Sequence, residues 1–371
     1  MSEYQYYEWQ ALDRPLTPEE QAEVGALSSH IDVTATQAVV TYSWGGGFRH
    51  DPLQVLARYF DAFIYLSSWG SRQLAFRFPR DLLPCHQIEP YLWDEYVQLK
   101  TCGDALILDI SPLDEDGERW GGWVEGEGRL SILSRLRNDL LAGDYRFLYL
   151  AWLLAADLDW AHEEVLEPPV PSGLQDLSPA LVSFMEFFQL DEYLVQAAAE
   201  ASPPLGQSPA VPVEEAIARL SPEERNDFLI RLALGEPHLT VKFNRRLQEL
   251  MGTAAPETPG PRRTWGELQA RAEQLRQEAE QRAREEAEAK RLQELQALAA
   301  REDAIWQEVM ALIEAKTSAS YDAALDRLFQ LQALADHQGR TAEFQARIAE
   351  LRERYPTRYG LRRRLDRLQR S

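Results

Sequence analysis

The hydrophobic and polar positions of this chain divide it into four segments with different patterns. Residues 1–166 alternate between short strand-like and helix-like stretches in mixed order, which favours an α+β domain. Residues 173–252 show helical periodicity only, and residues 264–316 are polar throughout. Residues 302–371 contain three short amphipathic helices, so we expect an all-α region after the first domain.

Capping and turn residues predict where the elements of the first segment begin. The capping box Thr17-Pro18-Glu19-Glu20 starts a short helix, and Asp51 caps an apolar stretch that predicts a helix over 53–69. Strands are expected over 4–12, 31–44 and 74–78, with a hairpin over 97–101 and 105–110, and helical sequence over 88–96 and 130–157.

Three Pro-rich stretches predict the boundaries between these segments. They cover residues 167–171, 203–212 and 254–263, and their spacing of Pro disfavours helix. The domains expected from them are an α+β domain at 1–166, a helical domain at 173–252, a long helix at 264–316 and a C-terminal helical module at 302–371.

The stretch 264–316 contains no Pro and a single Gly, Gly266, so it predicts one continuous helix. About fifty helical residues would reach on the order of 75 Å. Leu268 and Leu275 stand at heptad spacing, but Arg282 follows, so the first half lacks a coiled-coil seam. We expect that half to be mobile and the half from Leu292 onward to pack.

The last helices present three apolar faces, around Trp306, Leu325 and Ile348. Their order predicts a tetratricopeptide-like hairpin followed by one further helix. The tail from residue 350 onward carries eight Arg against three acidic residues, a net charge of +5. It would either fold back on the acidic part of the chain or contact phosphate groups.

Charge is distributed unevenly over the 371 residues. Residues 1–252 carry a net charge of −22 and residues 253–371 a net charge of +1, so the first part should repel nucleic acid. The two Cys form no CxxC pair, the first residues resemble no signal peptide, and the longest apolar stretch is too short for a membrane span. These features predict a soluble cytoplasmic protein without membrane contact.

Motifs for chemistry are weak. Glycines 45–47 follow a strand but lack the Lys-Ser/Thr of a phosphate-binding loop, and favour a plain turn. His162 begins an HExxH-like pattern in which Leu166 replaces the second His ligand. Acidic residues 114–116, with Asp109 nearby, suit a divalent cation or, more simply, a solvated loop. We predict no catalytic residue, no metal site and no cofactor.

Two stretches resemble known bacterial sequences. The start, YQYYEWQALDRPLTPEE at 4–20 with TYSW at 41–44, resembles a family of uncharacterised bacterial proteins. The end, from REDAIW at 301–306 through residues 338–340 to Leu365, is similar to the C-terminal helices of bacterial SWIM zinc-finger proteins, without their zinc ligands. The second resemblance implies a shared docking module.

These observations favour a non-enzymatic scaffold or adaptor that binds other proteins through its long helix and C-terminal helices, as a monomer or an oligomer. The residues predicted to contact a partner are Tyr321, Leu325, Leu328, Arg362, Arg363 and Arg364. A nucleic-acid-associated factor that acts through the Arg-rich tail is the alternative. An enzyme with an unrecognised site in the N-terminal domain is the third hypothesis.

Overall fold

The computed structural model of the chain describes residues 4–43, 46–112, 126–159, 161–205, 213–236, 238–251 and 262–369. They form two compact units, residues 1–276 and 277–371, and each unit has its own hydrophobic core. The expected fold class is confirmed, because an α+β unit with an antiparallel sheet precedes an all-helical region.

The first unit is built on a seven-stranded sheet in which neighbouring strands are all antiparallel. In spatial order, the strands are β2 (Ile31–Val33), β3 (Gln37–Tyr42), β1 (Gln5–Gln10), β4 (Ala62–Ser67), β5 (Arg72–Pro79), β7 (Ala105–Ile110) and β6 (Val97–Cys102). The inner strands are apolar on both faces, which is typical of a sheet covered on both sides.

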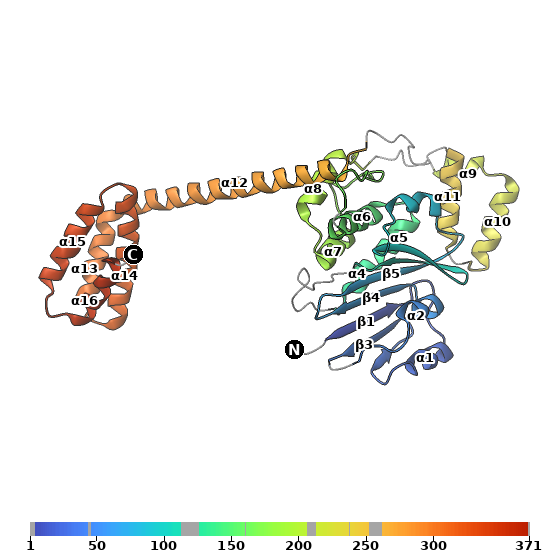
Figure 1. Ribbon diagram of the computed structural model, residues 1–371, viewed down its shortest axis with the longest axis horizontal. Helices are drawn as coiled ribbons and strands as arrows, with labels where there is room; N and C mark the ends of the chain where they lie inside the picture. Colours follow the sequence, from blue (N-terminus) through green and yellow to red (C-terminus); the bar gives the residue numbers. More distant parts are fainter. Residues whose placement is uncertain are drawn as a thin grey trace. The chain divides into compact units, whose positions relative to one another are not determined.

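Helices cover the two faces of this sheet unequally (Figure 1). On one face lie α1 (Pro18–Gly25) and α2 (Pro52–Tyr59), which enclose a small core around Trp9 and Phe63. The other face, which includes Ile64 and Leu66, meets a larger helical layer. This layer contains α4 (Arg129–Leu133), α5 (Arg135–Leu141), α6 (Arg146–Leu158), α7 (Pro179–Phe188) and α8 (Glu192–Ala201).

The prediction of one helix over 53–69 is wrong. The structure ends α2 at Tyr59 and starts the central strand β4 at Ala62. Almost every residue of β4 is buried, because its two faces contribute to different cores. Such a continuous apolar run has the same appearance in a buried strand and in a buried helix, so periodicity could not separate them. The helix expected over 88–96 is also shorter, as α3 (Cys85–Ile88) and the 3₁₀ turn η1 (Glu89–Tyr91).

The Pro-rich stretch 167–171 does not separate two domains. Phe147 before it and Phe184 after it belong to one core, and their rings lie 5.2 Å apart. The later part of the expected helical domain is joined to this core through Val241. It comprises α9 (Val213–Arg219), α10 (Pro222–Ala233) and α11 (Leu239–Met251), which share a small cluster around Leu220 and Leu247.

The long helix α12 (Trp265–Ala299) is anchored in the first unit at its start. Glu167, only 1% exposed, accepts two hydrogen bonds of 2.9 and 2.8 Å from the guanidinium of Arg263, and Tyr149 donates a third. The Trp265 side chain is fully buried, and its backbone amide donates to the Val165 carbonyl. The expectation that the whole first half of the helix is mobile is therefore wrong for its first three turns.

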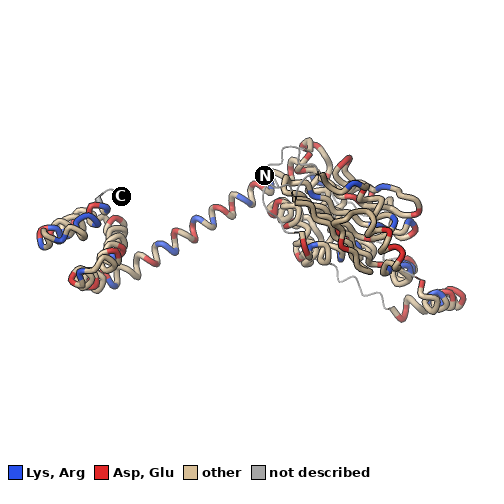
Figure 2. The backbone as a smooth tube through the Cα atoms, turned by 90° about the horizontal axis from the view of Figure 1, so that it is seen from below, with Lys and Arg blue, Asp and Glu red and all other residues tan. Residues whose placement is uncertain are grey.

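The rest of α12 has two different environments. All residues from 280 to 294 are exposed, and acidic and basic residues alternate along them (Figure 2). Contacts along the helix replace tertiary packing there, such as the pair of Glu280 with Arg284 and the hydrogen bond from Gln281 to Glu285. Leu295 is buried again, within the second unit.

The second unit is a bundle of short helices. It contains α13 (Glu302–Glu314), α14 (Ser318–His337), α15 (Thr341–Arg354), α16 (Tyr359–Leu365) and the 3₁₀ turn η2 (Asp366–Gln369). The single helix expected over 264–316 is wrong, because α12 ends at Ala299 and α13 begins three residues later. The turn between them allows Trp306 and Val309 to pack against α14 and α15. A tetratricopeptide-like arrangement stays a prediction.

Hydrogen exchange should divide α12 into three zones. We expect the amides of residues 280–294 to exchange faster than those of residues 269–276 and 295–299, because only these end zones contain a buried side chain, Ala272 and Leu295. Exchange measured by mass spectrometry on the full chain would show this difference. Uniform protection along the helix would contradict it.

Substitution of the anchor arginine should destabilise the first unit. Arg263→Met leaves the buried Glu167 carboxylate unpaired, so we expect the free energy of unfolding in urea to fall by about 3–5 kcal/mol. The double variant with Glu167→Leu removes both charges and serves as the control. It should recover much of that loss, whereas equal destabilisation by both variants would assign the effect to packing.

Candidate functional site

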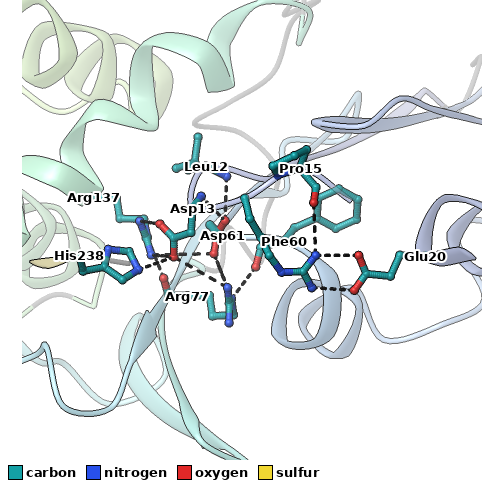
Figure 3. Close-up of polar contacts among 10 residues, drawn as sticks. Leu12, Asp13, Pro15, Glu20, Phe60, Asp61, Arg77, Arg137 and His238 are labelled. Atoms are coloured by element: carbon teal, nitrogen blue, oxygen red, sulfur yellow. Dashed lines mark hydrogen bonds and ion pairs between the residues drawn. The ribbon is translucent and has the colours of Figure 1, made fainter. Parts of the chain in front are cut away.

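A buried polar cluster joins the sheet to α5 and α11 (Figure 3). Asp13 and Arg137 form a two-pronged ion pair, with nitrogen–oxygen distances of 2.8 and 2.7 Å. Asp61 accepts hydrogen bonds from two backbone amides and pairs with Arg77. The Nε2 atom of His238, just before α11, lies 2.9 Å from the Asp13 carboxylate.

This cluster is closed and internally satisfied. The side chains of Asp61 and Arg137 are 3% and 1% exposed. Burial alone would raise the pKa of Asp61. The hydrogen bond from the Asp13 amide and the charges of Arg77 and Arg137 outweigh burial, and the pKa lies below its usual range. Since both carboxylates are already paired, we interpret the cluster as a structural contact that holds the sheet, α5 and α11 together.

A second buried carboxylate, Glu8 in strand β1, has only neutral partners. It is fully buried, and its oxygens accept from the Tyr6 hydroxyl at 2.8 Å and from the side-chain amides of Gln10 and Gln37 at 2.9 and 2.7 Å. Burial, and next the charge of Glu8, raise the pKa of Tyr6, which keeps its hydroxyl a donor. These bonds satisfy the carboxylate within the sheet.

The structure describes only part of the motifs singled out in the sequence. Among the described residues, no three His, Cys, Asp or Glu side chains are grouped so that they could hold a metal ion. Gly47 lies close to Gln5 and Tyr7, where an added Cβ would be 2.4 Å from the Gln5 amide oxygen, so it serves close packing. Gly45 and the acidic residues 114–116 lie outside the described residues. No helix within those ranges is long and apolar enough to span a membrane.

The predicted partner-binding residues have three different environments. Leu325 and Leu328 are buried in the core of the second unit, and Tyr321 is half-buried beside it. Arg364 pairs with Asp322 at 2.8 Å. Exposed Arg362 and Arg363 follow Tyr359 by three and four residues on α16.

The basic tail is held inside its own unit. Arg358 pairs with Glu314 at 2.9 Å, and Arg352 with Asp366 at 3.1 Å. These acceptors lie in the second unit, whereas a folded-back tail was expected to pair with acidic residues within 1–252.

The largest group of exposed apolar side chains on one described helix lies on α10, and it was not among the predicted sites. None of the α10 residues is buried. Leu229, Ile230 and Leu232, together with Leu234 at the helix end, are between 59% and 79% exposed. We call these four residues the α10 surface. The sequence feature that could have predicted this surface is the run from 228 to 234, which contains six apolar residues. One packed face of a helix cannot bury that many.

The side of α10 that faces α11 is already occupied. The rings of Phe228 and Phe243 lie 5.0 Å apart in an edge-on contact. A cleft of about 510 Å³ beside them is lined by charged side chains. Several of those side chains are paired with one another, as in the contacts of Arg231 with Asp227 and of Arg246 with Glu224. The α10 surface is therefore the candidate functional site of the first unit.

Comparison with protein-family models, with curated proteins and with solved structures finds no match for this chain in any of the three. The resemblances noted in the sequence therefore remain predictions.

Loss of the Asp61 charge should lower stability in a pH-dependent way. Because the folded state lowers the pKa of Asp61, its contribution is present above the unfolded pKa of about 3.9 and is lost as pH falls through the folded value. We expect Asp61→Asn to cost about 3–5 kcal/mol at pH 7 and less below pH 4, measured by urea unfolding.

The exposed Asp32 provides the control for this measurement. Asp32→Asn should change the free energy of unfolding by no more than about 0.5 kcal/mol at either pH. A similar effect of both substitutions would mean that the Asp61 cluster does not stabilise the fold.

Proposed function

We propose that the protein is a non-enzymatic adaptor that binds other proteins, and that the α10 surface is one of its binding sites. The observation that carries this proposal is the exposure of Leu229, Ile230, Leu232 and Leu234 on one short helix. Full burial of a leucine or isoleucine side chain is worth about 1.5–3 kcal/mol. An apolar group of this kind on a folded unit is typical of an interaction site.

We further propose that the occupant is an amphipathic helix of a partner protein. The surface lies on a helix whose opposite side already packs on α11, so another helix could add to this layer in the same way. Arg225 and Glu223 lie near its start and are both exposed. A partner helix with an apolar stripe and charges of both signs beside it matches these features.

The second unit carries the second binding site of the proposed adaptor. It has a core of its own, and the predicted resemblance of residues 301–365 to the C-terminal helices of SWIM proteins supports a docking role. Since Leu325 and Leu328 are buried, a partner would contact the outer side of α14, where Asp326 and Gln330 are exposed and Phe329 is half-buried. This proposal replaces the two leucines as contact residues.

Charged substitutions on the α10 surface should remove one set of partners. We expect the full-length variant Leu229→Glu with Leu232→Glu to lose proteins that the unaltered chain captures from its own cell extract, as measured by quantitative mass spectrometry. Glutamate favours helix and no residue of α10 is buried, so thermal unfolding should be unchanged.

Leu292, exposed on α12, provides a control that adds one negative charge away from the α10 surface. Leu292→Glu should leave the captured set intact. An identical set with the α10 variant would show that this surface is not a binding site. Loss of the same proteins with the Leu292 variant would assign the effect to added negative charge.

A further inference from the structure

One face of α16 combines an exposed aromatic ring with exposed arginines. Tyr359 is 80% exposed, and Arg362 and Arg363 follow it at the spacing that places side chains on the same side of a helix. Arg367, in η2, is also exposed. We call Tyr359, Arg362, Arg363 and Arg367 the arginine–tyrosine face. The opposite side of α16, with Leu361 and Leu365, is buried in the core and holds this face in place.

The arginines of this face are free of the ion pairs that hold their neighbours. Arg352, Arg358 and Arg364 each pair with an acidic side chain of the same unit. Within the described ranges, Arg362, Arg363 and Arg367 have no carboxylate within 4.0 Å. The one acidic residue of the face, Asp366, is paired with Arg352. The face therefore presents three arginines that form no ion pair with a described residue, beside an exposed phenol ring.

We infer that the arginine–tyrosine face binds single-stranded nucleic acid. The guanidinium groups of Arg362, Arg363 and Arg367 match phosphate oxygens in charge and geometry. The ring of Tyr359 offers a surface on which an unpaired base stacks. A duplex keeps its bases stacked inside, so the exposed ring contributes only with a single strand.

The distribution of charge restricts this binding to the second unit. Residues 1–252 carry a net charge of −22 and repel a polyanion, whereas the part of the chain after them is close to neutral. The function inferred is additional to the protein-binding role proposed above and uses different residues. An adaptor with both sites would bring a protein partner to a nucleic-acid strand.

Fluorescence anisotropy of the full-length protein with a labelled 20-mer of oligo(dT) tests this inference. We expect binding at 50 mM salt that weakens about 20-fold at 200 mM, since three phosphate contacts on a single strand give a slope of about −2 in log affinity against log salt. A 20-base-pair duplex of the same label should bind more weakly. Absence of binding at 50 mM salt, or tighter binding of the duplex, would overturn the inference.

Variants separate stacking from charge. Tyr359→Ala should weaken binding at least about fivefold without a change in the salt slope, and Tyr359→Phe should bind like the unaltered protein. Replacement of Arg362, Arg363 and Arg367 by Ala should weaken binding and bring the salt slope close to zero. All these side chains are exposed, so thermal unfolding should not change.

The matched control removes three exposed arginines from α12, at positions 282, 284 and 291. This change of charge is identical, and we expect the affinity for oligo(dT) to stay within about twofold. An equal loss in both triple variants would overturn the inference, because attraction would then depend on total charge and not on this face. The Leu229→Glu and Leu232→Glu variant should still bind, which keeps this test independent of the proposed protein-binding role.

Discussion

The ion pair between Glu167 and Arg263 is the contact on which the organisation of the first unit depends. Glu167 follows α6, and Arg263 lies two residues before the long helix, almost a hundred residues later. A buried carboxylate without a partner is strongly unfavourable, so the chain must return to this point to complete the core. Arg263 also donates to the carbonyl of Ala197 in α8, which adds a third segment to the junction.

The contact of Glu167 with Arg263 explains why the Pro-rich stretch 167–171 connects two parts of one core and does not separate two domains. Its prolines prevent helix, but Tyr91 donates a hydrogen bond to the carbonyl of Pro169, and the start of α12 completes the layer above the sheet. Leu268 and Ala272 bury the next turns of the helix against this layer. Further along, α12 leaves the core and depends on contacts between its own side chains.

The sequence predicted best those features that depend on neighbouring residues. The capping box at Thr17 begins a helix where expected, and the hairpin of β6 and β7 turns at Gly103, where φ is +60°. The predictions from the sequence were wrong where contacts with residues far away in the chain determine the structure. The run that becomes β4 needed knowledge of two covered sheet faces, and the domain boundary at 167–171 needed the pairing of Glu167 with Arg263.

The candidate sites show the same limit. Periodicity identifies the apolar face that contains Leu325 and Leu328, but it does not reveal that α13, α15 and α16 cover that face. For α10 the opposite holds, because its leucines look like core residues in the sequence and are exposed in the structure. Pairing of Arg364 but not of Arg363 depends on where Asp322 lies, which spacing along α16 cannot predict.

Because no side chain of α10 is buried, its outward residues are free of the packing constraints that act on the rest of the first unit. Substitutions there change what the helix can recognise with little effect on the free energy of folding. In a core helix such as α6, by contrast, a new side chain must first fit its neighbours. Binding specificity on α10 can therefore diverge between related proteins while the fold beneath it stays the same.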